Sequence, residues 1–150
     1  MNLNPVSREN PELTLRFLEL GRDYLSNLPE ENRERFLQSI LDLQGESERW
    51  LLLLEVEGDH IGFVHMMIDR DDRLGWGFIM EFYIEPQRRR TGWGCRMFGL
   101  CREILVEYGA RDIWLTTNPE AEPFWTKLGF EDTGMIDRRN DLKIMTMSIL

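Results

Sequence analysis

The chain has 150 residues, of which 42% are hydrophobic and 30% are charged, and its formal net charge is -9. That length favours one domain over residues 1–150, large enough to bury about 70% of its unfolded surface. No stretch approaches the ~20 apolar residues of a membrane-spanning helix, and the N-terminus lacks the regions of a signal peptide. The acidic balance disfavours nucleic acids and anionic membranes as partners and leaves amine-bearing partners open.

The two cysteines indicate a reducing compartment. Cys95 and Cys101 fall within one predicted helix and are expected to point to different sides of it, so they should not pair. We therefore expect a cytoplasmic protein without disulfides.

The first third of the chain predicts a short edge strand and two helices. The strand covers residues 1–4, and Asn10 followed by Pro11 marks the start of a helix over about residues 13–26. The apolar positions of that helix recur at helical spacing and are Leu13, Phe17, Leu20, Tyr24 and Leu28. A second helix is expected from Pro29 to Gly45, with an apolar face of Phe36, Leu37, Ile40, Leu41 and Leu43.

The rest of the chain predicts strands and two further helices. Residues 50–56, 61–68 and 76–84 are expected to form three antiparallel strands, the first two joined by a turn over residues 57–60. An amphipathic helix follows and ends at Gly109; its apolar positions are Met97, Leu100, Cys101, Ile104, Leu105 and Tyr108. The last expected elements are a strand, a helix and two strands, over residues 113–117, 121–128, 131–136 and 143–150.

The stretch from Glu81 to Gly94 carries the functional signal. A strand of aromatic and β-branched residues ends at Pro86, three arginines follow, and Gly92 and Gly94 lead into a helix. Free backbone N–H groups at a glycine-bearing helix N-terminus favour a bound phosphate. A dinucleotide fingerprint fits poorly because Met97 replaces its third glycine, and the Gly-Lys-Ser/Thr of a nucleotide-hydrolase loop is absent.

Two motifs carry a family resemblance. The first has the pattern Arg/Gln-x-x-Gly-x-Gly and reads Arg89-Arg90-Thr91-Gly92-Trp93-Gly94. The second is similar to Asn-x-x-Ala-x-x-Phe-Tyr-x-x-x-Gly-Phe and runs from Asn118 to Phe130. With the order of elements, they resemble the GNAT superfamily of acyl-CoA-dependent N-acyltransferases over nearly the whole chain. The resemblance implies a mixed α/β fold, with a mostly antiparallel twisted sheet of about seven strands flanked by about four helices.

The same resemblance implies acetyl-CoA as cosubstrate and no metal. The backbone N–H groups of residues 89–94 would hold the pyrophosphate, and the pantetheine arm would lie where the fourth strand splays away from the fifth. An amide near Ile84 would polarise the thioester carbonyl. The residues expected at the coenzyme are Phe82, Tyr83, Ile84, Arg89, Arg90, Thr91, Gly92, Trp93, Gly94, Asn118 and Trp125.

Acyl transfer to an amine also needs a base, and Glu81 is the best candidate because its strand would line the acyl site. Glu85 and Asp69 are weaker candidates, and His65 within a strand favours a packed histidine. Trp125 stands where many relatives have a tyrosine that protonates the departing thiolate. Either Tyr83 or water would then do so, or the thiolate leaves without a dedicated acid, while Trp125 packs the short helix and walls the coenzyme pocket.

The acceptor is the open question. The resemblance predicts transfer of an acetyl group to a primary amine by direct attack in a ternary complex, and the acidic charge favours a small cationic amine or a peptide or protein amine. The replacement of tyrosine by Trp125 motivates an alternative, a CoA-binding or interaction module that keeps the fold without turnover. A structural domain with an incidental basic turn is a further alternative. The sequence leaves open whether two copies form a homodimer.

Overall fold

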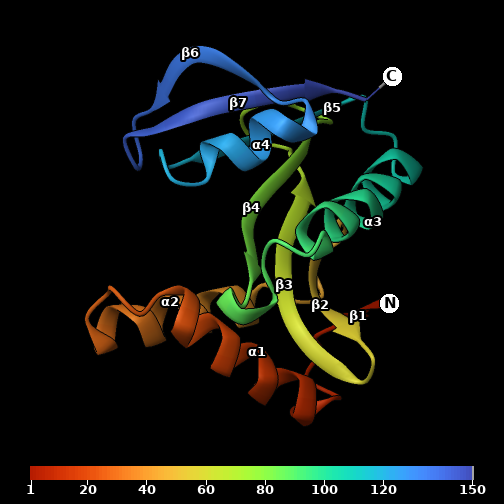
Figure 1. The fold of residues 1–150 in the computed structure, drawn as a ribbon, viewed down its shortest axis with the longest axis vertical. Helices are drawn as coiled ribbons and strands as arrows, with labels where there is room; N and C mark the ends of the chain where they lie inside the picture. Colours follow the sequence, from red (N-terminus) through yellow and green to blue (C-terminus); the bar gives the residue numbers. More distant parts are fainter. Residues whose placement is uncertain (150) are drawn as a thin grey trace. The chain divides into compact units, whose positions relative to one another are not determined.

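The computed structural model describes residues 1–149 and contains the elements in the predicted order (Figure 1). The helices are α1 (Pro11–Tyr24), α2 (Glu30–Asp42), α3 (Trp93–Glu107) and α4 (Glu122–Leu128). The strands are β1 (Asn2–Pro5), β2 (Arg49–Val56), β3 (Asp59–Ile68), β4 (Gly77–Ile84), β5 (Asp112–Thr117), β6 (Glu131–Asp137) and β7 (Leu142–Ser148). Leu150, the end of the last predicted strand, lies outside the described residues. None of the helices within residues 1–149 is long and apolar enough to cross a membrane.

The strands form one sheet in the order β1-β2-β3-β4-β5-β7-β6. The pairs β1/β2, β5/β7 and β6/β7 are antiparallel, whereas β4 and β5 are parallel. All six residues of β5 pair with β7, but the register of β5 with β4 comprises two pairs, Gly77 with Ile113 and Phe78 with Trp114. The prediction of a mostly antiparallel seven-stranded sheet with four helices is therefore confirmed.

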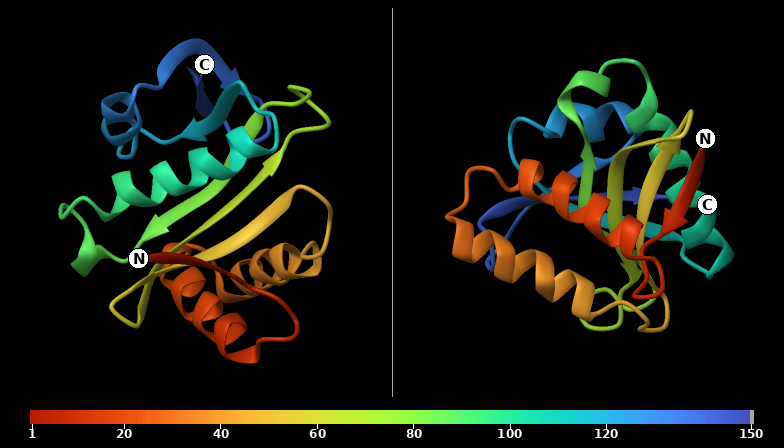
Figure 2. Two further views of the ribbon diagram at one scale, coloured as in Figure 1. Left: turned by 90° about the vertical axis from the view of Figure 1, so that its right-hand side faces the viewer. Right: turned by 90° about the horizontal axis from the view of Figure 1, so that it is seen from below.

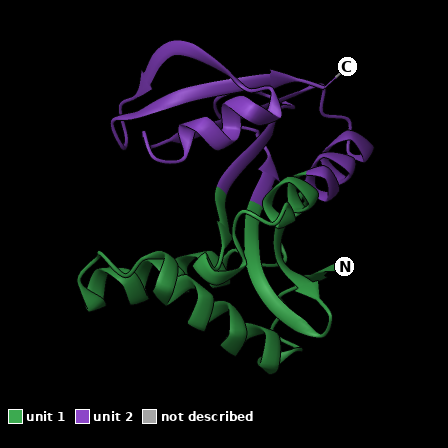
Figure 3. Ribbon diagram, in the orientation of Figure 1, with its two compact units in different colours: residues 1–65, 81–98 green, residues 66–80, 99–150 purple. Residues whose placement is uncertain are grey.

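The chain divides into two compact units (Figure 3). Unit 1 combines Met1–His65 with Glu81–Phe98, and unit 2 combines Met66–Met80 with the described part of Gly99–Leu150. Strands β3 and β4 and helix α3 each run through both units, so neither unit is a continuous stretch of sequence.

In unit 1, helices α1 and α2 lie on one face of the strands (Figure 2). The buried cluster beneath them comprises Val6, Phe17, Leu20, Leu37, Ile40, Leu51, Leu53, Phe63 and Tyr83. Two predicted core positions are wrong: Leu28 lies beyond the end of α1 and is 37% exposed, and Phe36 is 38% exposed. Because Leu37 and Ile40 turn the apolar face of α2 inward, the adjacent Phe36 is rotated toward solvent.

Unit 2 contains the β5-β7-β6 end of the sheet, with α4 beside β6 and β7 (Figure 1). The Nζ of Lys143 in β7 lies 2.8 Å from a carboxylate oxygen of Glu122 in α4, which ties the helix to the strand. Leu105 of α3 packs so closely on Gly77, the first residue of β4, that a Cβ at position 77 would come within 2.7 Å of it. Tyr108, predicted on the buried face of this helix, follows the end of α3 and is 51% exposed.

The hairpin between β2 and β3 is tighter than the sequence suggested. Its turn consists of Glu57 and Gly58, which both have positive φ values, 52° and 84°. Two consecutive residues with positive φ are the signature of the type I′ turn that matches the twist of paired strands. As a result β3 begins at Asp59, two residues before the predicted strand.

Gly21 tests the packing of α1 on α2. A Cβ at this position would lie 2.5 Å from Cδ2 of Leu37, which is fully buried. We expect Gly21→Ala to lower the free energy of unfolding by about 1–3 kcal/mol, because a filled core resists an added methyl group. Urea denaturation followed by circular dichroism measures the loss.

Gly99 in α3 is the matched control, since a Cβ there would meet nothing within 4 Å. Gly99→Ala should stabilise the protein by about 0.5–1 kcal/mol through lower backbone entropy in the unfolded chain. Equal effects of the two substitutions would show that the contact with Leu37 does not restrict position 21.

Candidate active site

Glu81 and Tyr83 lie on the same face of β4, because alternate residues of a strand share a face. Tyr24, the last residue of α1, donates a hydrogen bond from its hydroxyl to Oε2 of Glu81. The rings of Tyr24 and Tyr83 are tilted against each other, with centroids 5.4 Å apart. The end of α1 therefore meets β4 at a carboxyl group flanked by two phenol rings.

The surroundings of Glu81 adjust its acidity to neutral pH. Burial of the carboxyl raises the pKa of Glu81 from 4.5 to about 7, and the hydrogen bond from Tyr24 acts in the opposite direction. Burial, reinforced by the charge on Glu81, raises the pKa of Tyr24, so its hydroxyl remains a donor. A carboxyl group that titrates near pH 7 can take up a proton from an amine and release it again.

Tyr83 is 6% exposed and belongs to the core of unit 1. Its ring lies 5.8 Å from that of Phe63, and the Arg89 guanidinium carbon lies 5.3 Å from its centroid. Burial is the main cause that raises the pKa of Tyr83, so the phenol is protonated at neutral pH. It retains the proton that a general acid needs, and its catalytic role stays a prediction.

The loop between β4 and α3, residues 85–92, is the loop for which the sequence predicts anion binding, and we call it the cradle loop. A short 3-10 turn, Pro86–Arg88, follows the strand, and Arg90 and Gly92 then adopt positive φ values of 64° and 87°. The N–H of Arg96 donates to the carbonyl of Gly92 at 3.1 Å and closes the first turn of α3. The N–H groups that precede this bond, from Gly92 to Cys95, have no intrahelical partner and form the positive end of the helix dipole.

The three consecutive arginines have different surroundings. The guanidinium of Arg88 pairs with Oδ2 of Asp59 at 3.0 Å. Nε of Arg89 donates to the carbonyl of Ile84 at 2.7 Å, so this side chain folds back onto the strand. Arg90 is exposed and makes no ion pair or side-chain hydrogen bond within residues 1–149. The loop thus uses two arginines for its own structure and leaves the Arg90 guanidinium available to an anion.

Phe82 and Ile84 project from the face of β4 opposite to Glu81. Beside them, β3 approaches so closely that a Cβ at Gly62 would lie 2.3 Å from the carbonyl oxygen of Tyr83. Only glycine permits this approach, which fixes the peptide between Tyr83 and Ile84.

In unit 2, Asn118 precedes α4 and Trp125 lies within it. Oδ1 of Asn118 accepts the N–H of Ala121 at 2.8 Å, and its backbone carbonyl accepts the N–H of Glu122 at 3.2 Å. Trp125 is 6% exposed and packs edge-to-face on Phe130, with ring centroids 5.3 Å apart. Trp125 thus packs on the segment that follows α4. A coenzyme contact by either residue stays a prediction.

Asp69 has a structural role. Its carboxylate is buried and accepts N–H groups from Asp71, Asp72 and Arg73, together with Nε1 of Trp114 at 3.0 Å. Burial alone would raise the pKa of Asp69, but these hydrogen bonds outweigh it and lower the pKa. Asp69 therefore holds the turn between β3 and β4 as an anion.

His65 and Glu85 also have partners within the fold. Burial, with the nearby charge of Arg49, lowers the pKa of His65 to about 3, so the imidazole is neutral and its Nε2 accepts from Arg49 at 3.0 Å. Glu85 pairs with Arg16 at 3.3 Å. Glu81 is thus the candidate base whose surroundings leave it poised near neutral pH.

Tyr24 was missed by the sequence analysis, which placed it in the apolar stripe of α1. A tyrosine in such a stripe needs a partner for its hydroxyl, and this was the available signal. No group of three or more His, Cys, Asp or Glu residues within residues 1–149 is placed to hold a metal ion.

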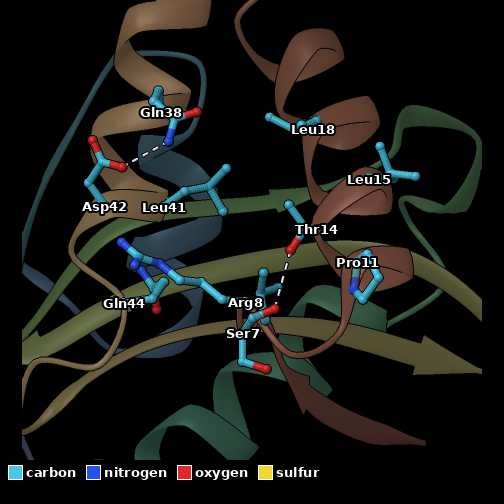
Figure 4. Close-up of a pocket in the computed structure, with 11 residues that line it drawn as sticks. Ser7, Arg8, Pro11, Thr14, Leu15, Leu18, Gln38, Leu41, Asp42 and Gln44 are labelled. Carbon is cyan, nitrogen blue, oxygen red and sulfur yellow. Dashed lines mark hydrogen bonds between the residues drawn. The ribbon is translucent and has the colours of Figure 1, made fainter.

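A separate hollow of about 500 Å³ lies between the start of α1 and the end of α2 (Figure 4). It is lined by Val6, Ser7, Arg8, Pro11, Thr14, Leu15, Leu18, Gln38, Leu41, Asp42 and Gln44. On its wall, Nε2 of Gln38 donates to Oδ1 of Asp42 at 2.8 Å, and Figure 4 marks this hydrogen bond with a dashed line. None of the predicted site residues lines this hollow, so the candidate active site is assigned to β4 and the cradle loop.

Comparison with known proteins agrees with this fold. The model of the acetyltransferase (GNAT) family matches residues 15–130. Aminoglycoside 6'-N-acetyltransferase from Enterococcus faecium has a TM-score of 0.77 at 16% identity, covering 100% of this chain and 98% of its own. The PaiA N-acetyltransferase from Thermoplasma acidophilum in complex with coenzyme A has a TM-score of 0.74 at 19% identity, covering 98% of each chain. An acetyltransferase from Thermus thermophilus has a TM-score of 0.75 at 20% identity, covering 99% of this chain and 96% of its own.

Comparison with curated protein sequences found no significant match. The likeness to the solved structures, at these low identities, defines the fold. Because the family model spans most of the chain, the chain belongs to the acetyltransferase (GNAT) family. It is therefore an acyl-CoA-dependent N-acyltransferase.

Proposed function

We propose that the chain transfers an acetyl group from acetyl-CoA to a primary amine by direct attack within a ternary complex. The observation that carries the proposal is the Glu81 carboxyl, whose pKa is raised to about 7 on the strand that leads into the cradle loop. A proton acceptor suited to neutral pH on this strand supports the proposal, because β4 is the strand that we expect to line the acyl site.

The coenzyme would be held mainly by backbone groups. The free N–H groups from Gly92 to Cys95 and the guanidinium of Arg90 are suited to the pyrophosphate. Thr91 supports the loop by donating from Oγ1 to the carbonyl of Arg88 at 2.9 Å. The remaining coenzyme contacts proposed for the chain are Phe82, Ile84, Arg89, Trp93, Gly94, Asn118 and Trp125.

The chain's residues have separate tasks in this mechanism. Glu81 takes a proton from the acceptor ammonium, directly or through a water, and leaves a neutral amine that can attack the thioester carbonyl. An N–H near Ile84 stabilises the negative charge that develops on the carbonyl oxygen. The thiolate that leaves takes its proton from Tyr83 or from water, because the indole of Trp125 does not donate one at neutral pH.

The acceptor would be a small cationic amine or a peptide or protein amine. The negative net charge favours a cation, and Asp23 lies close enough to Tyr83 to raise the pKa of its phenol. A similar solved structure is named as an aminoglycoside acetyltransferase, which makes aminoglycosides one class to test.

We also propose that residues 1–150 act as one domain. The family model covers parts of both units, and three elements run through both of them. The alternative of a CoA-binding module without turnover is motivated by Trp125 at the position of the usual tyrosine.

The test measures thiol release from acetyl-CoA with a panel of polyamines, aminoglycosides and lysine peptides, beside the thermal shift caused by CoA. We expect a CoA-dependent rise in melting temperature and turnover with at least one amine. Stabilisation by CoA with no turnover on the panel would favour the binding module, and no stabilisation would contradict the cradle.

A further inference from the structure

The contact between Tyr24 and Glu81 joins residues that are 57 positions apart in the sequence. Within residues 1–149, Tyr24 provides the one side-chain hydrogen bond that Glu81 accepts. The bond uses Oε2 of the carboxylate, so Oε1 is the oxygen left for a substrate or a water.

The ring of Tyr24 is held in place by its neighbours. It packs edge-on against Phe63, with centroids 5.6 Å apart at 87°, and is tilted against Tyr83 at 5.4 Å. Helix α1 is itself anchored by Phe17 and Leu20, which are fully buried. A phenol fixed on two sides cannot move its hydroxyl freely, so the direction of its hydrogen bond is set by packing.

We propose that Tyr24 is a positioning residue for the reaction: its hydroxyl holds Oε2 of Glu81 so that Oε1 faces the acceptor amine. This inference rests on the proposed role of Glu81 as the base. Tyr24 itself keeps its proton throughout, and the proton from the ammonium passes to Oε1 alone.

Other charged groups around this site are engaged elsewhere. On β3 and β2, His65 is neutral and bonded to Arg49. Around Tyr83, the groups that act on its phenol are Asp23, Arg89, Glu85 and Arg16. Arg89 bonds the Ile84 carbonyl and Glu85 pairs with Arg16, while Asp23 is exposed at the end of α1. Of these groups, none replaces the Tyr24 hydroxyl as a donor to Glu81.

The test is Tyr24→Phe, which keeps the ring and removes the hydroxyl. Because the hydrogen bond lowers the pKa of Glu81, its loss should move the Glu81 titration to higher pH. The titration is followed by NMR in protein labelled with ¹³C-glutamate, and the Glu81 signal is identified by its absence in Glu81→Gln. With the best amine of the panel, kcat should fall by about 10- to 100-fold, with KM for acetyl-CoA unchanged and the acid limb of the pH profile shifted upward.

Tyr108→Phe is the matched control, since it removes the hydroxyl of a half-exposed tyrosine beyond α3 and should change neither the titration nor kcat. An unchanged titration or an unchanged kcat in Tyr24→Phe would overturn the inference. Full activity of Glu81→Gln would instead show that Glu81 is not the base, and so contradict the proposed function. If Glu81→Gln is inactive while Tyr24→Phe has the kcat and the Glu81 titration of the wild-type protein, only the positioning role is contradicted. Urea denaturation confirms that each variant is folded.

Discussion

Glu81→Gln is expected to lower kcat/KM for amine acetylation by about 100- to 10,000-fold while CoA binding is unchanged. Glutamine keeps the size of the side chain and can still meet the Tyr24 hydroxyl, but it cannot take a proton from an ammonium group. Steady-state kinetics with the best amine of the panel measure the loss, and calorimetric titration with CoA measures binding. Undiminished turnover would exclude Glu81 as the base.

The same substitution should stabilise the protein above neutral pH. The folded-state pKa of Glu81 is about 7 against 4.5 for the free side chain, so the folded protein binds more protons between these values. The wild-type protein therefore loses stability as pH rises from about 4.5 to about 7, and the loss persists at higher pH. Glutamine does not ionise, so Glu81→Gln should be more stable at pH 8 by at most about 3.5 kcal/mol, at ~1.4 kcal/mol per pKa unit.

Urea denaturation at pH 5 and pH 8 separates this effect from general changes. Glu103→Gln, an exposed carboxyl on α3, is the control and should alter neither activity nor the pH dependence of stability. A Glu81→Gln variant that loses activity without gaining stability at pH 8 would show that the carboxyl is well solvated. A loss of activity together with a gain in stability is expected when a substitution removes a charged group that the active site keeps out of water.

Gly92→Val should weaken CoA binding by about 10- to 100-fold. Gly92 has a φ of 87°, which a β-branched residue adopts only with strain of about 1–3 kcal/mol. Relief of that strain would turn the N–H groups of Trp93 and Gly94 away from the position that we propose for the pyrophosphate. Calorimetric titration with CoA, and the thermal shift that CoA causes, measure the effect.

Gly109→Val is the matched control at the other end of α3. Gly109 has a φ of 92°, and neither glycine has an atom within 4 Å of a Cβ at its position. Both substitutions should therefore cost a similar amount of stability, but only the one in the cradle should affect CoA. An unchanged CoA affinity in Gly92→Val would contradict the proposed place of the pyrophosphate.

Local signals in the sequence were sufficient to predict the elements of the fold. The cap of α1 at Asn10, whose side chain accepts the N–H of Leu13, and the stop at Gly109 are both set by nearby residues. The errors at Leu28 and Phe36 arose where an apolar residue next to a helical stripe was counted as part of it. Periodicity identifies the buried face, but the packing partner decides where that face ends.

The parts of the candidate site that are close together in the sequence could be predicted from it, and the distant parts could not. The cradle lies within a few residues of β4, so its turn and helix start could be identified together. The partner of Glu81 could not, because Tyr24 reaches it only when α1 packs on the sheet. The sequence also did not distinguish Arg89, which folds back onto Ile84, from Arg90, because the direction of a side chain depends on the turn that carries it.

Gly62 in β3 has no side chain that could react or bind, yet its close contact with β4 fixes the position of the Tyr83 carbonyl. With a Cβ there only 2.3 Å from the Tyr83 carbonyl oxygen, any larger residue would displace the peptide that we place beside the thioester. The close packing of β3 on β4 therefore restricts position 62 to glycine, and the same contact fixes the backbone of the strand that carries Glu81. In an engineered or naturally diverging sequence, position 62 should therefore accept only glycine, whereas the exposed Asp23 at the end of α1 meets no such steric limit.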